Sequence, residues 1–234
     1  MFRLGTVNTG AFDHLDELAS IARRENLWFH VDGACGSLII LDPQRRQLVE
    51  GIQDADSLAF DFHKWFHCPY DAGCALVRDG NSLRATFSKQ QSYLAQPGRA
   101  CTGDWPSYFD LGPELSRLFR ALKVWFTFRE HGTKKLGQTI ANNCHHAQYL
   151  VSLLEKHEDT IRILRPVSLN IVNFRFEPDA LDQSSEELVN RFYVRVCIAN
   201  HRSTFADVKI LVEALLTMYQ SRASNRDTRS SIDA

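Results

Sequence analysis

A lysine and an aspartate each follow a short apolar run in this sequence. Residues 57–60 are typical of a buried strand, and His63 and Lys64 come shortly after them. Residues 27–31 form a second apolar run, which Asp32 ends. Ligands of open α/β sheets bind beyond the carboxyl ends of the strands. A primary amine and a carboxylate at two such ends therefore indicate a site for nucleophilic and acid–base chemistry.

This pair of groups matches the needs of one common cofactor. Pyridoxal phosphate (PLP) requires a lysine that forms a Schiff base and an acidic residue that pairs with its pyridinium nitrogen. A single lysine at the start of a loop is more often a surface residue. Here Asp32 ends another apolar run, and the small residues 33–36 after it let a flat group approach the backbone. Lys64 and Asp32 are therefore residues of the two types that PLP requires.

Two motifs carry a resemblance to a known family. They are His-Val-Asp-Gly-Ala at residues 30–34 and His-Lys-Trp at residues 63–65, and the match extends through Tyr93 and residues 118–125 to residues 195–198. On these residues the sequence resembles the group II PLP-dependent amino-acid decarboxylases, which include aromatic-amino-acid, glutamate and cysteine-sulfinate enzymes. The resemblance covers essentially the whole chain.

The resemblance implies a role for each matching residue at the cofactor. Lys64 would hold PLP as a Schiff base until the substrate amine displaces it, and we expect a desolvated site to lower the pKa of this lysine. Asp32 would keep the pyridine nitrogen protonated, so that the ring accepts the electrons left when carbon dioxide departs. Ala34 would lie under the ring, where a larger side chain would displace it.

Three further residues are expected at the site. His63 would contact the phosphate or assist proton movement, and a structural hydrogen bond is the competing account. Tyr93 lies in a polar segment that in the family forms a mobile loop, and it would protonate the carbanion at Cα. An ordinary loop tyrosine is the alternative. Thr6 belongs to a turn that in relatives lies near the ring of the cofactor.

The resemblance also has departures. Family members are considerably longer at the amino end, so we expect this chain to lack the N-terminal part, including the phosphate-binding loop. Asp61 and Phe62 occupy positions where many relatives have Asn and Pro, and a carboxylate near a phosphate is unfavourable unless it is paired or points away. Three functions therefore stay open: an amino-acid carboxy-lyase acting through Lys64, another fold-type I PLP enzyme such as an aminotransferase, and an inactive family remnant. Aromatic, acidic and sulfinate substrates all remain possible.

The elements that position these residues alternate along the chain. We expect a helix after an Asp13 cap, a strand at 73–77, a helix over 114–131 that Gly132 ends, and later strands and helices finishing with a helix over 205–219. This alternation predicts a layered α/β protein with a mainly parallel sheet. By resemblance it is a partial large domain of the aspartate-aminotransferase-like fold-type I plus a small C-terminal α/β domain. The expected boundaries are 1–120 for the PLP-binding part, 121–222 for the small domain and 223–234 for a mobile tail.

The composition of the chain argues against several classes of binding partner. The chain has 234 residues, 44% of them hydrophobic, and a net charge of −1, which gives no electrostatic case for nucleic acid or an anionic membrane. No apolar run approaches the roughly 20 residues of a membrane helix. The six cysteines form no Cys-x-x-Cys pair, so we expect no metal site and reduced thiols in a cytoplasmic protein. The resemblance implies an amino-acid substrate and a homodimer.

Overall fold

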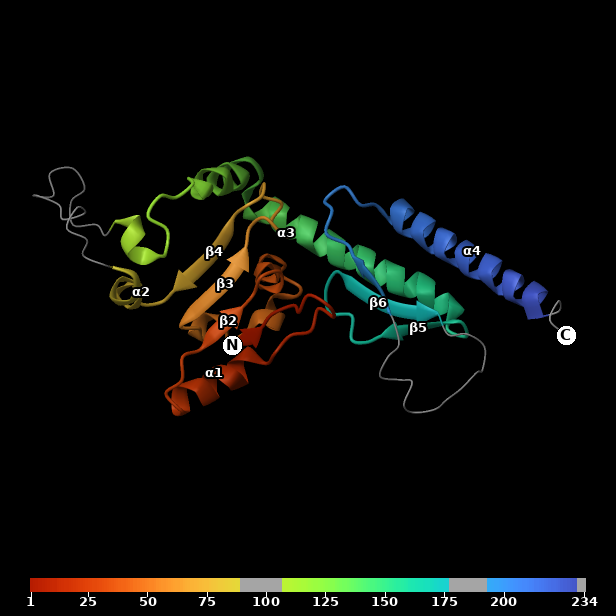
Figure 1. Ribbon diagram of the computed structural model, residues 1–234, viewed down its shortest axis with the longest axis horizontal. Helices are drawn as coiled ribbons and strands as arrows, with labels where there is room; N and C mark the ends of the chain where they lie inside the picture. The colour runs from red at the N-terminus through yellow and green to blue at the C-terminus, as the bar shows by residue number, and fades with distance from the viewer. Residues whose placement is uncertain (89–106, 177–192, 231–234) are drawn as a thin grey trace, which may run out of the picture.

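Two β-sheets joined by one long helix make up the protein. The computed structural model describes residues 1–88, 107–176 and 193–230 (Figure 1). The strands are β1 (Phe2–Arg3), β2 (His30–Asp32), β3 (Ser57–Asp61), β4 (Gly73–Val77), β5 (Ile161–Leu164), β6 (Ile171–Phe176) and β7 (Val194–Cys197). The α-helices are α1 (Leu15–Arg24), α2 (Gly80–Phe87), α3 (Arg120–Leu154) and α4 (Phe205–Ser230). Short 3₁₀ helices connect them: η1 (Gly36–Leu41), η2 (Arg46–Val49), η3 (Ile52–Asp54), η5 (Tyr108–Leu111) and η6 (Glu155–His157).

The first sheet has the strand order β1-β2-β3-β4. Strands β1, β2 and β3 are parallel, and β4 pairs antiparallel with β3 as a neighbouring strand in the chain. In the register of β2 and β3, Asp32 lies opposite Ala59. Because parallel strands end at the same edge of a sheet, Asp32 and the residues that follow Asp61 meet at one edge. The predicted mainly parallel sheet is confirmed.

The second sheet is antiparallel, with the order β5-β6-β7. Helices α3 and α4 run alongside each other next to this sheet (Figure 1). Apolar side chains from both helices and from β6 form one buried cluster, which includes Leu150, Val172, Phe174 and Val208. This arrangement is the small α/β unit that the sequence predicts after the parallel sheet.

Helix α3 belongs to the cores of both sheets. Leu136, Ile140 and Cys144 pack in the first core, whereas Ala147 and Leu150 pack in the second. The helix is interrupted at Gly132, whose backbone angles (φ 67°, ψ 160°) are not helical. Glycine adopts this positive φ without the steric cost that a Cβ brings. The predicted helix end at Gly132 is therefore confirmed as a break, and a second helical stretch follows it to Leu154.

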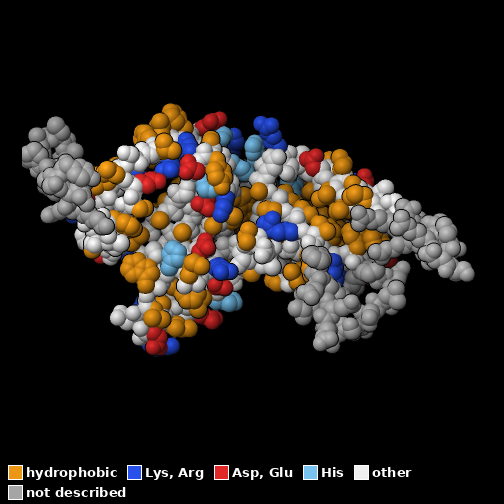
Figure 2. Space-filling model, in the orientation of Figure 1, with side chains coloured by type: hydrophobic (Ala, Val, Ile, Leu, Met, Phe, Trp, Pro, Cys, Tyr) orange, Lys and Arg blue, Asp and Glu red, His pale blue; other side chains and the backbone are white. Residues whose placement is uncertain are grey.

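Two local expectations are wrong. Asp13 does not cap α1, because its carboxylate accepts a hydrogen bond from the Arg3 backbone N–H (2.7 Å) and His14 is the residue before the helix. The helix expected over 114–131 begins at Arg120, and much of its apolar side faces outward. Figure 2 shows hydrophobic side chains gathered over this part of the surface. The exposed residues there are Leu115, Leu118, Phe119, Leu122, Trp125 and Phe126.

The last helix is longer than the sequence pattern suggests. Helix α4 continues from Phe205 to Ser230, past the expected end at Tyr219 and into the segment predicted as a tail. Within the residues that the structure describes, no helix combines the length and the apolar character needed to cross a membrane.

Candidate active site

Lys64 and Asp61 form an ion pair at the carboxyl end of β3. The distance from Lys64 Nζ to Asp61 Oδ2 is 2.8 Å, and the side chains are 40% and 23% exposed. A turn places them, since the Lys64 backbone N–H donates to the Asp61 carbonyl and the His67 N–H donates to the Lys64 carbonyl. Asp61 is therefore paired, as a carboxylate in this position requires. The neighbouring Phe62 turns inward and packs edge-on against the ring of Phe66.

The charge state of Lys64 differs from the expectation. Burial acts to lower the pKa of the Lys64 amine, but the hydrogen bond to Asp61 and the electrostatic interactions with Cys35, Asp61 and Asp32 outweigh it. The net result is a pKa raised above its ordinary value. The predicted lowering is wrong, because the sequence did not show that Asp61 and Lys64 share one turn. Asp32 ends β2, which is the parallel neighbour of β3, so the Asp32 carboxylate and the Lys64 amine belong to the same edge of the sheet.

Asp32 ends β2 and turns its carboxylate back onto the following loop. Its Oδ1 accepts a hydrogen bond from the Ala34 backbone N–H (3.2 Å), which fixes both predicted residues in one small turn. The loop needs glycine here: a Cβ on Gly36 would lie 2.4 Å from the Leu4 carbonyl oxygen, and a Cβ on Gly33 would lie 2.6 Å from Ser37 Cβ. The small residues after Asp32 thus bring the turn after β1 close to the site.

His63 has a defined tautomer. Its Nδ1 accepts a hydrogen bond from the Ala72 backbone N–H (3.0 Å), and a backbone N–H only donates. The neutral ring therefore carries its proton on Nε2. The ring also lies against Tyr70, with centroids 4.0 Å apart. The structural hydrogen bond that was the alternative explanation for His63 is present. It leaves the Nε2–H of the ring available as a donor.

Thr6 stabilises a turn between the two sheets. Its hydroxyl pairs with the Thr9 hydroxyl (2.8 Å) and accepts from the Ala11 backbone N–H (3.1 Å). In the same turn, the Asn8 carbonyl accepts a hydrogen bond from Asn173 Nδ2 on β6 (2.9 Å). The hydroxyl of Thr6 is thus used within the turn, and the turn is attached to the second sheet.

A buried hydrogen-bond chain anchors the segment that carries Lys64. Trp65, the next residue, is 2% exposed, and its Nε1–H donates to Asn143 Oδ1 on α3 (2.9 Å). Asn143 Nδ2 in turn donates to the carbonyl of Asn200, after β7 (3.1 Å). Buried polar groups that satisfy one another in this way define one arrangement of the elements that they join. The lysine is therefore positioned by both structural units.

Cys35 interacts electrostatically with Lys64 and was not among the predicted site residues, and neither were Arg195 and Cys197, which act on Cys35. Burial raises the pKa of the Cys35 thiol, and the charges that act on this thiol include Lys64, Cys197, Asp61 and Arg195. Cys35 lies in the loop of small residues directly after Asp32, and this position in the sequence could have identified it as a site residue. Arg195 and Cys197 lie on β7, and only the packing of the second sheet against the first brings them close.

Two other expectations concern Tyr93 and a metal site. Tyr93 lies outside the described residues. Within the described ranges, no group of three or more His, Cys, Asp or Glu side chains is arranged to hold a metal ion.

The groups that are placed suit PLP. The Lys64 amine and the Asp32 carboxylate follow the carboxyl ends of neighbouring parallel strands, at one edge of the sheet. An amine to bond the cofactor and a carboxylate to pair with its ring nitrogen are thus both present.

Comparisons with known proteins identify relatives of this chain. The pyridoxal-dependent decarboxylase conserved domain matches residues 1–177. The aromatic-L-amino-acid decarboxylase of Bacillus atrophaeus is 34% identical, over 86% of this chain and 46% of that protein. The structure of mouse CSAD in apo form is 26% identical with a TM-score of 0.78, over 92% of this chain and 50% of that one.

A further solved structure supports the fold. Oryza sativa TDC with PLP and tryptamine has a TM-score of 0.84 at 23% identity, over 94% of this chain and 50% of that chain. The likeness confirms the predicted fold class. The chain spans about half the length of the curated relatives and solved chains that it matches.

Proposed function

The chain belongs to the family of pyridoxal-dependent decarboxylases, and from this premise we propose that it binds PLP and removes the α-carboxylate of an amino acid as carbon dioxide. The observation that supports this most directly is that Asp32 and Lys64 follow the carboxyl ends of the neighbouring parallel strands β2 and β3. Because the chain spans about half of its relatives, the activity is a proposal for this chain rather than a property taken over from them.

Lys64 and Asp32 have complementary tasks in this proposal. Lys64 bonds the cofactor, and Asp61 holds the amine in place beforehand through the 2.8 Å ion pair. Asp32 keeps a proton on the ring nitrogen, because a nearby negative charge favours the protonated form. Bound PLP supplies an acceptor for the electron pair that stays behind when carbon dioxide departs.

The remaining predicted residues support binding and proton transfer. Ala34, next to Asp32 in the same turn, would lie under the ring, where its small methyl group would leave room for a flat cofactor. His63 donates from Nε2–H to the phosphate or to a reacting group, since its Nδ1 is already occupied by the Ala72 N–H. Thr6 would act indirectly, by fixing a turn that would lie near the ring of the bound cofactor.

We assign Tyr93 the role of returning a proton to Cα after carbon dioxide has left. A Tyr93→Phe variant keeps the ring and removes the phenolic proton, so amine production should fall by about tenfold or more if this proton transfer matters. Undiminished amine production by the variant would exclude the role.

The substrate that we propose is an L-amino acid with an aromatic side chain. The curated relative at 34% identity is an aromatic-L-amino-acid decarboxylase, and this favours aromatic over acidic or sulfinate substrates. Measurement of carbon dioxide released from tyrosine, tryptophan, glutamate and cysteine sulfinate would rank these classes. Faster release from an acidic substrate would overturn the choice.

The proposed cofactor chemistry is tested by visible absorbance. The chain is purified with added PLP, and its spectrum is recorded before and after borohydride, beside a Lys64→Ala variant. We expect a band of protein-bound PLP that borohydride converts to a permanent attachment in the wild type and not in the variant. A folded wild type without such a band would favour the inactive remnant. A trapped cofactor without release of carbon dioxide from any amino acid would favour another fold-type I PLP enzyme.

We further propose a homodimer in the cytoplasm. The exposed apolar residues at the start of α3 form a patch of the kind that marks protein interfaces. Arg120 at this patch is tied to Asp71 (3.0 Å), so the surface is held in one conformation. Sedimentation should give twice the chain mass, and Phe126→Asp should reduce it to one chain mass. The five cysteines of the described ranges are free, which suits a reducing compartment.

A further inference from the structure

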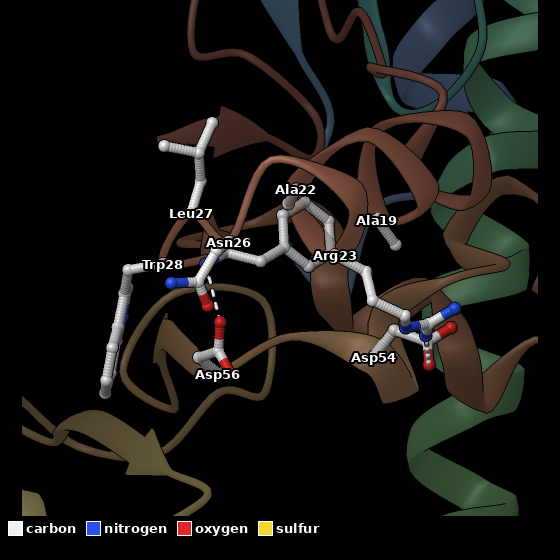
Figure 3. A pocket seen from close by; sticks show the side chains of 9 residues that line it. Ala19, Ala22, Arg23, Asn26, Leu27, Trp28, Asp54 and Asp56 are labelled. Atoms are coloured by element: carbon white, nitrogen blue, oxygen red, sulfur yellow. Dashed lines mark hydrogen bonds and ion pairs between the residues drawn. The ribbon is translucent and has the colours of Figure 1, made fainter.

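A cavity lies at the end of the first sheet opposite to Lys64. Its volume is about 340 Å³, and its lining includes Trp28 and Asp56 (Figure 3). These two residues come just before β2 and β3, at the amino ends of the strands, whereas Asp32 and Lys64 follow the carboxyl ends. The five residues of β3 span roughly 16 Å, at about 3.3 Å per residue. The cavity is therefore distinct from the candidate active site.

The indole of Trp28 is exposed and yet held in one orientation. Its side chain is 55% exposed, while its Nε1–H donates to Ser57 Oγ (2.8 Å). Ser57 Oγ also bonds to His30 Nδ1 (2.7 Å), so the hydroxyl that fixes the indole is itself fixed. A large aromatic ring that is both rigid and accessible is pre-organised for contact with a ligand, because binding costs it little conformational freedom.

Asp56 is equally well fixed and has an available oxygen. Its Oδ2 accepts the Phe29 backbone N–H (2.7 Å), and its own backbone N–H donates to the Phe29 carbonyl (2.8 Å). Among the residues that the structure describes, none hydrogen-bonds Oδ1 of Asp56. The carboxylate and the Trp28 indole both line the cavity, below Asn26 in the view of Figure 3.

The charges of the lining leave a net negative site. Arg23 is paired with Asp54 (2.9 Å) in the wall, so the single positive charge is already compensated and Asp56 is not. Ala19 and Ala22 form the side of the cavity that α1 contributes, and their short side chains leave space for an apolar group. The lining therefore suits a ligand with one positive charge and an apolar body.

We propose that this cavity is a binding site for an arylalkylammonium ion. The ammonium group would lie against the Trp28 indole and the free oxygen of Asp56, where a cation gains both a cation–π contact and a charge-assisted hydrogen bond. The aryl group would fill the space beside the two alanines. A free amino acid is disfavoured, because its carboxylate would meet the negative lining. The proposal does not depend on the activity at Lys64.

Calorimetric titration of the full chain with phenethylamine tests this site. The Lys64→Ala variant is titrated without PLP, so that binding at the active site does not contribute. We expect saturable binding that weakens with added salt, and phenylalanine, which differs by its carboxylate, should bind at least tenfold more weakly. Equal binding of amine and amino acid, or no saturable binding of the amine, would overturn the proposal.

Variants of the lining locate the binding. Asp56→Asn keeps an oxygen for the Phe29 N–H and removes the charge, and it should weaken phenethylamine binding at least tenfold. Ala22→Leu should abolish binding by filling the cavity. Tyr108→Leu is the matched control, since Tyr108 is also an exposed aromatic residue (78%) but lies on η5, and it should leave binding unchanged. Circular dichroism establishes that each variant is folded. Unchanged affinity in both folded cavity variants would exclude this location.

Discussion

At the scale of single residues, the charge of Lys64 results from two opposing effects. Burial favours the neutral amine, while Asp61 at 2.8 Å and the more distant Asp32 favour the ammonium form, and the second effect is larger. A neutral amine is the form that attacks an aldehyde. Asp61 therefore fixes the position of the Lys64 amine, and it also reduces the fraction of neutral, reactive amine at neutral pH.

This balance predicts the behaviour of an Asp61→Asn variant. Loss of the carboxylate removes the main group that raises the pKa of Lys64, so burial should prevail and lower that pKa. The rate of PLP attachment, followed by absorbance, should then reach its plateau at a lower pH than in the wild type. Asp79→Asn is a suitable control, because Asp79 caps α2 through the Asn81 N–H and lies outside the site. A pH profile that moves equally in both variants, or in neither, would contradict this account of Lys64.

At the scale of elements, the contact between α3 and η1 depends on one glycine. A Cβ on Gly137 would lie 2.2 Å from the Leu41 carbonyl oxygen, so the helix approaches the η1 backbone more closely than any side chain allows. Gly137→Ala should gain helix propensity but separate the two elements, with a net loss of about 1–3 kcal/mol of unfolding free energy. Urea denaturation measures this loss.

Gly80 provides the matched control for that substitution. It is also helical, at the start of α2, and a Cβ there would meet no atom within 4 Å. Gly80→Ala should therefore leave the unfolding free energy unchanged or slightly raised. A Gly137→Ala variant as stable as Gly80→Ala would mean that α3 and η1 move apart at no cost.

The sequence pattern predicts individual elements better than their packing. Residues 73–77 are β4 as expected, because their apolar run is bounded by turn residues. The side of residues 115–126 predicted to be buried is exposed, since periodicity identifies an apolar face and does not say what covers it. Strand β5 was not anticipated in its short segment between α3 and β6.

The same limit applies to the candidate site. Asp32 and Lys64 could be identified because Asp32 ends one apolar run and Lys64 follows shortly after another, and this signal is local. The proximity of Arg195 to Cys35 arises from the packing of two sheets, for which no short stretch of sequence carries a signal.

At the scale of the whole molecule, a histidine cluster lies where three parts of the chain meet. His67 follows the Lys64 turn with a positive φ of 60°, His131 precedes the α3 kink, and His201 precedes α4. The rings of His67 and His201 are 5.2 Å apart, and Nε2 of His67 is buried without a hydrogen-bond partner in the described structure. Burial, together with the charges of His201 and His131, lowers the pKa of His67 below its ordinary value of 6.5.

The lowered pKa makes the stability of the fold depend on pH in a defined direction. Above about pH 6.5 the ring is neutral in both folded and unfolded chains, so no stability is lost. As the pH falls below that value the unfolded chain takes up a proton more readily than the folded chain, and the free energy of unfolding should decrease until the folded-state pKa is passed. Urea denaturation from about pH 8 to about pH 5 should show this decrease.

Replacement of His67 separates this effect from general acid sensitivity. Asn tolerates a positive φ and does not titrate, so His67→Asn should flatten the decrease in unfolding free energy below about pH 6.5 even though it loses the ring contact. His14→Asn, at an exposed position before α1, should retain the wild-type slope. His146 also has a lowered pKa, through burial and His145, so part of the slope should remain in His67→Asn. If the slope in His67→Asn equals that of the wild type, the junction of the three segments is insensitive to protonation, and the acid sensitivity arises at His146 in the second core.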